Sequence, residues 1–388
     1  MSVLDSLPML IDVSRLAGRL MDGKHPTGVD RVSLAYLRHY RERARALVRH
    51  RGRWLRLGDE ASRKVFAALL GESGMPQRTV RLNVAQAHLL RGSSCRGWTL
   101  LNTGHSGLDD PGYAYAVRRF RLRPVYFLHD LIPLTHPEYS RPQEDDKHHQ
   151  RLATMLDTGS CLIFNSGATR QDLVDYVARY GSSLPPHVVA PLGIEPLPTP
   201  GAEALLPEPY FVMLGTIEPR KNHLLILHVW RRFAELGETP PKLVLIGQRG
   251  WECEQVIDLL ERSPALRGSV IELPRCNDTE LATWLRHARA LLFPSFVEGF
   301  GLPLIEAVSQ GTPVLAADLP VFRESVGEIP EYLDPLDGPA WLDAVRAYSV
   351  AADPRRRTQL ERLRGYQRWD WGAHFAIVDP FLERCRAI

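Results

Sequence analysis

Two carboxylates in a glycine-bearing segment are the residues best placed to do chemistry. Glu298 and Glu306, with seven residues between them, lie in the stretch FPSFVEGFGLPLIEAVSQG, which runs from Phe293 to Gly311. Carboxylates accept hydrogen bonds from hydroxyl groups, and free N–H groups at a helix N-terminus bind anions such as phosphate. The pattern favours a ligand with both phosphate and many hydroxyl groups, such as a nucleotide sugar. The alternative is an ordinary strand–turn–helix whose glutamates only face solvent and the helix dipole.

The local sequence predicts how these carboxylates are positioned. Residues 290–293 form an apolar run that suits a strand buried on both faces. Gly299 and Gly301 allow a sharp turn and a close approach to a ligand. Pro303 suits the start of a helix, and Gly311 suits its end.

A second segment predicts an anion site of its own. Residues 210–214 (YFVML) read as a strand, and GTIEPRKN follows at 215–222 before a helix. Arg220 and Lys221 add two fixed cations to the positive end of the helix dipole, which suits a diphosphate. The alternative is an ordinary Arg–Lys pair on the surface.

These two segments together resemble the signatures of the retaining glycosyltransferases of family 4. The resemblance rests on two motifs, E-G-F-G-L-P with its second glutamate and G-T-x-E-P-R-K-N. It is specific over residues 210–320 and weak over the first 120 residues. The resemblance implies an α/β protein of the GT-B fold, with two Rossmann-like domains facing a central cleft.

The resemblance also implies roles for individual residues. Arg220 and Lys221 should hold the leaving diphosphate, Glu298 the sugar hydroxyls and Glu306 the ribose, while the backbone of 299–302 should hold the distal phosphate. With His129 beside the sugar, the catalytic candidates are Arg220, Lys221, Glu298 and His129. The donor-binding candidates are Glu306, Gly299, Phe300, Gly301, Leu302, Gly28, Val29, Ser166, Gly215, Thr216, Arg275 and Cys276. No Asp-x-Asp triplet is evident, so we expect no metal and no cofactor.

The first half of the chain offers weaker signals. Residues 9–13 read as the first strand, and Thr27-Gly28 as a glycine loop between that strand and the first helix, where ligands of α/β sheets bind. His129 follows the apolar run 125–128, again at a strand end. Without the resemblance, Gly28 is equally a turn glycine, His129 a core residue and Ser166 a helix cap.

The stretch Arg38–Arg56 is almost purely cationic, with Glu42 as its one acid. It reads as a basic helix that is either merely solvated or attracted to anionic lipid. Beyond it, the pattern predicts a helix at 63–70 and strands at 79–84 and 98–102.

Composition sets the remaining limits. The proline-rich segment 195–209 predicts a boundary, which gives domains at 1–195 and 196–365 and a helix at 366–388 that crosses back to the first. A net charge of +3 gives no indication of nucleic-acid binding.

Five scattered cysteines favour a reducing compartment over disulfides. With no signal peptide or long apolar run evident, we expect a cytoplasmic protein that works peripherally at the inner face of the membrane.

The resulting functional hypothesis is transfer of a sugar, with retention, from a nucleotide diphosphate donor to a surface-glycan or lipid-linked acceptor. GTIEPRKNH and TGVDRV resemble mannosyl-type transferases most, which favours GDP-mannose or a related deoxysugar donor and lipopolysaccharide biosynthesis. The alternatives are a nucleotide-sugar hydrolysing epimerase of the same fold and a non-catalytic tethering subunit. The sequence leaves the donor, acceptor, linkage and oligomeric state open.

Overall fold

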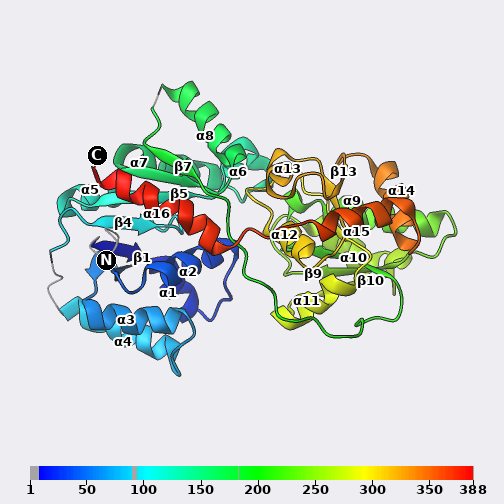
Figure 1. Ribbon diagram of the computed structural model, residues 1–388, viewed down its shortest axis with the longest axis horizontal. Helices are drawn as coiled ribbons and strands as arrows, with labels where there is room; N and C mark the ends of the chain where they lie inside the picture. The colour runs from blue at the N-terminus through cyan, green and yellow to red at the C-terminus, as the bar shows by residue number, and fades with distance from the viewer. Residues whose placement is uncertain (1–7, 90–93, 182, 388) are drawn as a thin grey trace. The chain divides into compact units, whose positions relative to one another are not determined.

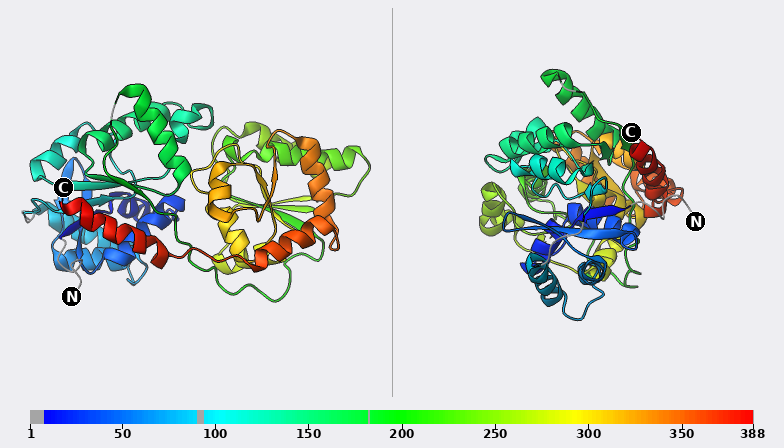
Figure 2. Two further views of the ribbon diagram at one scale, coloured as in Figure 1. Left: turned by 45° about the horizontal axis from the view of Figure 1, so that its top comes forward. Right: turned by 90° about the vertical axis from the view of Figure 1, so that its left-hand side faces the viewer.

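The chain divides into two compact units, each built on its own sheet (Figures 1 and 2). The computed structural model describes residues 8–89, 94–181 and 183–387. The first unit comprises Met1–Thr135, Gln143–Leu192 and Trp371–Ile388, and the second His136–Pro142 and Gly193–Asp370. The chain therefore passes between units near the predicted boundary at 195 and again before the last helix. The short segment 136–142 belongs to the second unit, and nothing in the sequence predicts this.

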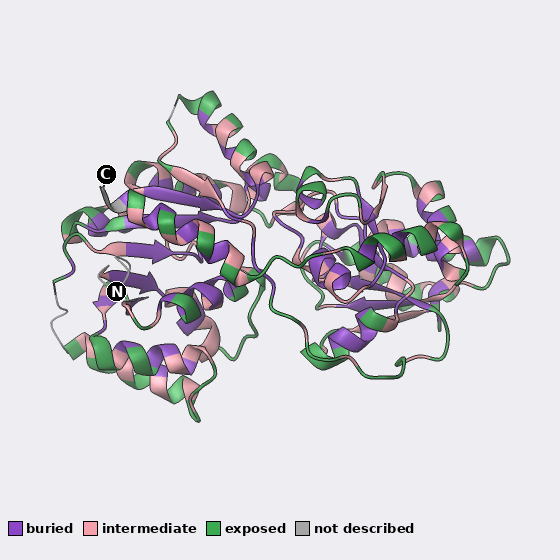
Figure 3. Cartoon of the chain, viewed as in Figure 1, coloured by how far each residue is buried: buried purple, intermediate pink, exposed green. Residues whose placement is uncertain are grey.

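The first unit contains a seven-stranded sheet of order β3-β2-β1-β4-β5-β6-β7, in which only β2 and β3 pair antiparallel. Its central strands are continuous apolar runs because helices cover both faces, and they are buried along their length (Figure 3). The strands are β1 Met9–Asp12, β2 Ala44–His50, β3 Arg53–Arg56, β4 Thr99–Asn102, β5 Arg123–Leu128, β6 Cys161–Phe164 and β7 His187–Val189.

Helices from both halves of the sequence pack on this sheet. Buried aromatic and aliphatic side chains such as Tyr126, Phe164 and Leu152 form its core. The helices are α1 Ser14–Met21, α2 Gly28–Tyr40, α3 Asp59–Leu69, α4 Pro76–Leu89, α5 Gly112–Phe120, α6 Ile132–Thr135, α7 Glu144–Thr158, α8 Gly167–Tyr180 and α16 Trp371–Ala387.

The cationic stretch is not a basic helix, so that prediction was wrong. It comprises the end of α2 and the strands β2 and β3, with Leu47 and Leu55 buried. Its arginines meet acids from distant parts of the chain: Arg49 Nε lies 3.2 Å from Asp12, and Arg45 Nη2 lies 2.8 Å from Asp59. Asp12 and Asp59 lie outside the stretch, so its own sequence does not show that its arginines are paired with acids.

The strand predicted at 79–84 was also wrong, because these residues lie within α4. Val80 and Val84, four residues apart, are both buried, which is the spacing of one face of a helix. The helix packs against α3.

The second unit contains a fully parallel six-stranded sheet of order β10-β9-β8-β11-β12-β13. Its core gathers Phe211, Trp230 and Trp341 between the sheet and helices α9 and α14. The strands are β8 Tyr210–Leu214, β9 Lys242–Ile246, β10 Val270–Leu273, β11 Leu291–Phe293, β12 Val314–Ala317 and β13 Glu331–Leu333. The helices are α9 His223–Glu235, α10 Glu254–Arg262, α11 Asp278–His287, α12 Leu302–Ser309, α13 Pro320–Val326, α14 Gly338–Ser349 and α15 Pro354–Arg364.

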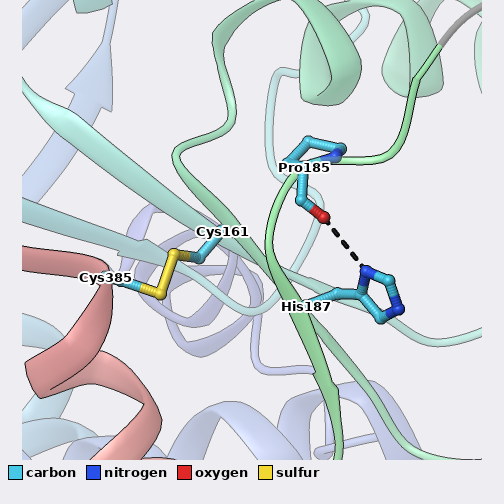
Figure 4. The surroundings of a disulfide bond; sticks show 4 residues. All are labelled: Cys161, Pro185, His187 and Cys385. Atoms are coloured by element: carbon cyan, nitrogen blue, oxygen red, sulfur yellow. Dashed lines mark hydrogen bonds between the residues drawn. A yellow bond between two sulfur atoms is a disulfide. The ribbon is translucent and has the colours of Figure 1, made fainter. Parts of the chain in front are cut away.

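The last helix, α16, is tied to the first unit. His374 Nδ1 donates to Pro191 O at 2.8 Å, and His374 Nε2 lies 2.9 Å from the Tyr36 hydroxyl. Cys385 of α16 forms a disulfide with Cys161 of β6 (Figure 4). The expectation of unpaired cysteines was therefore wrong, because residues 224 positions apart meet only in the folded chain.

None of the helices in the described ranges is both long and apolar enough to cross a bilayer.

Candidate functional site

The two motif segments of the second unit meet because β8 and β11 are neighbours in the sheet. After β8 the chain adds β9 and β10 on one side, then returns to place β11 on the other side of β8. The loops that follow β8 and β11 therefore leave the sheet at the same edge and in opposite directions. Ligands of open parallel sheets bind at such a switch in strand order.

Glycine is required where the β11 loop enters α12. Gly301 has a φ of 92°, and a Cβ there would lie 2.7 Å from Cε1 of the Phe322 ring. Any other residue would be strained and would clash with a buried ring. The loop can therefore turn into α12 only with this glycine.

A cluster of four charged side chains forms where the two loops meet. The carboxylate of Glu298 accepts from both Lys221 Nζ and Arg220, with the Arg220 Nη1–Glu298 Oε2 distance at 2.6 Å. Arg220 Nη2 also lies 2.6 Å from Glu218 Oε1. Glu218, Lys221 and Glu298 are buried, and Arg220 is partly exposed. The motif cations and the first motif glutamate are thus in direct contact.

One backbone bond and one side-chain bond hold the two loops together around the charges. Phe296 N donates to Arg220 O at 2.8 Å, and Asn222 Nδ2 donates to Pro294 O at 3.3 Å. Asn222 itself adopts a left-handed conformation with φ 55° between the 3₁₀ turn Pro219–Lys221 and α9. The arrangement is rigid because each loop satisfies polar groups of the other.

The electrostatics keep Glu298 ionised. Burial opposes its charge, but the adjacent Arg220 and Lys221 outweigh burial and lower the pKa of Glu298 to about 2. Burial lowers the pKa of Lys221 and raises the pKa of Glu218, in each case against the effect of opposite charges nearby. The fixed charges could bind a ligand that carries both anionic groups and hydroxyl groups.

The remaining candidates of this unit lie at the same edge of the sheet. Glu306 is buried in α12, in the second turn after Gly301. Gly215 and Thr216 directly follow β8. Arg275 is exposed in the loop after β10, and burial with nearby acids raises the pKa of Cys276 to about 11. Since β10 is two strands from β8, this loop starts roughly 10 Å away from the end of β8.

In the first unit, His129 lies at the end of β5, as predicted, and is buried. Its Nε2 donates to Thr103 O at 2.7 Å, and its ring centre lies 5.1 Å from that of His105. His105 Nε2 donates to Phe127 O at 2.7 Å, and His148 Nε2 donates to Asp130 O at 3.2 Å. Burial is the main cause that lowers the pKa of all three histidines, which favours their neutral forms.

Gly28 and Val29 begin α2, but the reasoning from a first strand–helix loop was wrong because α1 lies between β1 and α2. The second turn of α2 nevertheless contacts the loop after β4. Ser33 of α2 accepts from Thr103 Oγ1 at 2.9 Å, directly after β4.

Ser166 is fully buried and caps α8 by accepting from Thr169 N at 3.0 Å. Its hydroxyl is therefore already used within the unit. Donor contact by Ser166 stays a prediction.

Sequence reasoning missed four residues of these clusters. Glu218 could have been found, because an acid two positions before Arg220 in a tight turn can pair with it. Arg15, whose Nε lies 2.8 Å from Asp30 beside Gly28, has no local signal. The local sequence gives no sign that His105 and His148 lie close to His129, because only the fold brings these rings together. In the ranges that the structure describes, no three His, Cys, Asp or Glu side chains gather as a metal site would require.

Solved structures with the same architecture identify the fold. The HepE protein of Anabaena, solved with UDP, superposes with a TM-score of 0.66 over 98% of this chain and 100% of its own at 16% identity. Sucrose-phosphate synthase from Thermosynechococcus elongatus gives a TM-score of 0.65 over 98% and 100% at 17% identity. Two Rossmann-like units of this kind define the GT-B fold.

Sequence comparison adds a family match over one part of the chain. Residues 202–329, which include both motif loops, match the family of glycosyl transferases group 1. The serotype-specific mannosyltransferase WbdA of Escherichia coli is 31% identical over 220 residues, which cover 52% of this chain and 27% of that protein. The O-antigen chain mannosyltransferase B of Escherichia coli is 29% identical over 234 residues, 58% of this chain and 60% of its own. The chain thus carries a glycosyl transferases group 1 domain and is homologous to bacterial O-antigen mannosyltransferases, although it spans only about a quarter of the length of WbdA.

Proposed function

We propose that the protein is a retaining glycosyltransferase that moves a sugar from a nucleotide diphosphate donor to a hydroxyl of a glycan or lipid-linked acceptor. The observation that carries the proposal is the buried contact of Arg220 and Lys221 with Glu298, at the switch point of a sheet within the matched family domain. A surface Arg–Lys pair, the alternative interpretation of this motif, does not account for the burial of Lys221 and Glu298.

In this proposal the two cations bind the diphosphate and stabilise the negative charge that grows on it as the glycosidic bond breaks. Glu298 would then accept hydrogen bonds from the sugar hydroxyls with the lone pairs that the two cations leave free. The N–H groups of 299–302, at the first turn of α12, hold the distal phosphate, and Glu306 accepts from the ribose. We assign no general base, because the leaving phosphate itself takes the acceptor proton in a retaining reaction of this type.

From the first unit we assign His129 to the donor sugar, with Gly28 and Val29 near the donor phosphate and the acceptor. The His129 ring is well suited to an orienting role, because burial and its bond to Thr103 O fix its orientation. Charge compensation by Arg220 and Lys221 makes the reaction independent of metal, so activity should persist in a chelator.

We propose GDP-mannose or a related deoxysugar donor, because GTIEPRKNH and TGVDRV resemble mannosyl-type transferases and several relatives are named mannosyltransferases. The HepE structure contains UDP, which makes a uridine nucleotide the main competitor. Since two of the relatives are named O-antigen chain mannosyltransferases, we assign this protein to surface-polysaccharide synthesis at the cytoplasmic face of the membrane. Of the cationic stretch, Arg38 near the end of α2 is exposed, as are Arg51 and Arg53 at the β2–β3 turn, so these arginines could contact anionic lipid.

Calorimetric titration with GDP-, UDP-, dTDP- and ADP-sugars tests the donor assignment. We expect one nucleotide to bind and Glu306→Ala to abolish its binding. Binding that survives this change would contradict the role of Glu306, and no binding to any of the four would favour a tethering subunit. Release of free sugar without acceptor, as fast as transfer with acceptor, would favour the epimerase alternative.

A further inference from the structure

The outer face of α4 carries an apolar stripe that the fold does not use. Met75, directly before α4, and Leu82 and Leu89 within α4 follow one another at intervals of seven residues, the spacing that lines side chains up along one side of a helix. Their exposed fractions are 61%, 59% and 87%. Val80 and Val84, on the opposite face, already supply the buried contacts of this helix. Three exposed apolar side chains in line indicate a surface that meets something apolar.

Basic side chains flank this stripe. Arg78 lies beside Met75, with its Nη1 3.7 Å from Met75 Sδ, and Arg81 is exposed one turn further on. At the other end, Arg53 of β3 donates to His88 O at 3.1 Å, next to Leu89. The sequence of α4 contains no Asp or Glu. Within the described ranges, neither Arg78 nor Arg81 forms an ion pair with a carboxylate.

We infer that α4 is a docking helix for an anionic lipid surface, with Met75, Leu82 and Leu89 inserted among the headgroups and Arg53, Arg78 and Arg81 on lipid phosphates. An apolar stripe with arginines at its edges is the pattern of helices that lie in a membrane interface. A second copy of the chain fits less well, because a two-fold contact would bring the same arginines together. The inference rests on the proposed function and names its membrane partner. It makes α4, together with Arg53, the lipid-binding surface in place of the rest of the cationic stretch.

Flotation of the full-length protein with vesicles tests this inference. We expect binding to vesicles of phosphatidylcholine with phosphatidylglycerol, and little to phosphatidylcholine alone. The double change Leu82→Glu and Leu89→Glu should lower the bound fraction at least tenfold. Arg78→Gln and Arg81→Gln should each weaken binding by about fivefold, with a smaller effect at high salt.

Val350→Glu is the matched control, because Val350 is an exposed apolar residue (57%) at the end of α14 in the second unit. It should bind vesicles like the unmodified protein. Circular dichroism and thermal unfolding confirm that each variant folds. The donor titration is run without vesicles, so loss of the proposed function and loss of lipid binding are distinguishable.

Three results would overturn the inference. The first is that the unmodified protein fails to float with anionic vesicles. The second is that the leucine variants float as well as the unmodified protein. In the third, light scattering without vesicles shows a dimer that Leu82→Glu dissociates, which would make this face a contact between copies of the chain.

Discussion

Glu298 carries a buried negative charge that two cations neutralise before any ligand is present. The ion pairs with Arg220 and Lys221 lie where charges are poorly solvated, so removal of one partner is costly even when the intact cluster contributes little. A donor diphosphate would bring new negative charge to the same cations. Glu298 therefore has a structural task and a proposed ligand-binding task at once.

Glu298→Gln should lower the free energy of unfolding by about 3 kcal/mol, because it leaves Lys221 buried without a charged partner. Urea denaturation measures the change. Glu238→Gln, which removes an exposed pair with Arg346, is the control and should change stability by less than about 1 kcal/mol. An equally small effect of Glu298→Gln would contradict the picture of a coupled buried cluster.

The same carboxylate predicts a pH dependence of stability. Its pKa is lowered from 4.5 to about 2 in the folded chain, so its contribution is complete above pH 4.5 and is lost as pH falls toward 2. The stability difference between the unmodified protein and Glu298→Gln should therefore shrink over this window in acid unfolding curves. A difference that shrinks only above pH 5 would show that another group is responsible.

Arg220→Ala and Lys221→Ala should each lower turnover by about 10²–10³-fold, because each removes a fixed positive charge from the growing charge of the leaving group. Steady-state kinetics with the donor found by titration measures this. Arg231→Ala, in an exposed pair with Glu235 on α9, should leave turnover unchanged. Near-normal turnover in both site variants would refute the diphosphate assignment.

At the scale of elements, α16 depends on contacts that lie far away in the sequence. Its disulfide to β6 closes a large loop, and cross-links of this kind contribute about 2–4 kcal/mol, mainly by restricting the unfolded chain. Cys385→Ser should therefore lower the melting temperature, and a reductant should lower it in the unmodified protein but not in Cys385→Ser. The control is Cys95→Ser, since Cys95 is buried but unpaired. Equal melting temperatures with and without reductant would show that the thiols are not linked.

His374 adds a pH-sensitive contact to the same helix. Burial lowers the pKa of His374 to about 4, and its hydrogen bond to the carbonyl oxygen of Pro191 offsets only part of this effect. Stability from this residue is present above the unfolded pKa of 6.5 and falls as pH drops toward 4, by up to about 3 kcal/mol. His374→Gln should flatten the pH dependence of unfolding in this window. His25→Gln, at an exposed site, should leave it unchanged.

At the scale of the whole molecule, each unit has its own sheet and core, so each should unfold as a cooperative body. Scanning calorimetry should resolve two transitions, and a donor at a hundred times its Kd should stabilise the second unit by about 2.7 kcal/mol. Arg220→Ala should remove this shift. If the donor raised the melting temperature of the first unit alone, the nucleotide would bind there, and its assignment to the second unit would be wrong.

The sequence by itself determined the local elements that carry the two motifs of the second unit. Glycines, prolines and continuous apolar runs specify the loops and buried strands locally, so 210–222 and 290–311 could be assigned from residue types and spacing. The GT-B architecture followed from these motifs by resemblance, and the comparisons confirm it.

Only the tertiary structure decided which distant residues meet. The order of strands placed β11 beside β8 and so brought Glu298 to Arg220 and Lys221. Long-range contacts turned a cationic stretch into paired strands, joined Cys161 to Cys385, and brought the rings of His105 and His148 close to His129. Helix α4 was misread as a strand because its apolar residues lie on two faces. Such contacts depend on the packing of the whole chain, and local patterns do not carry that information.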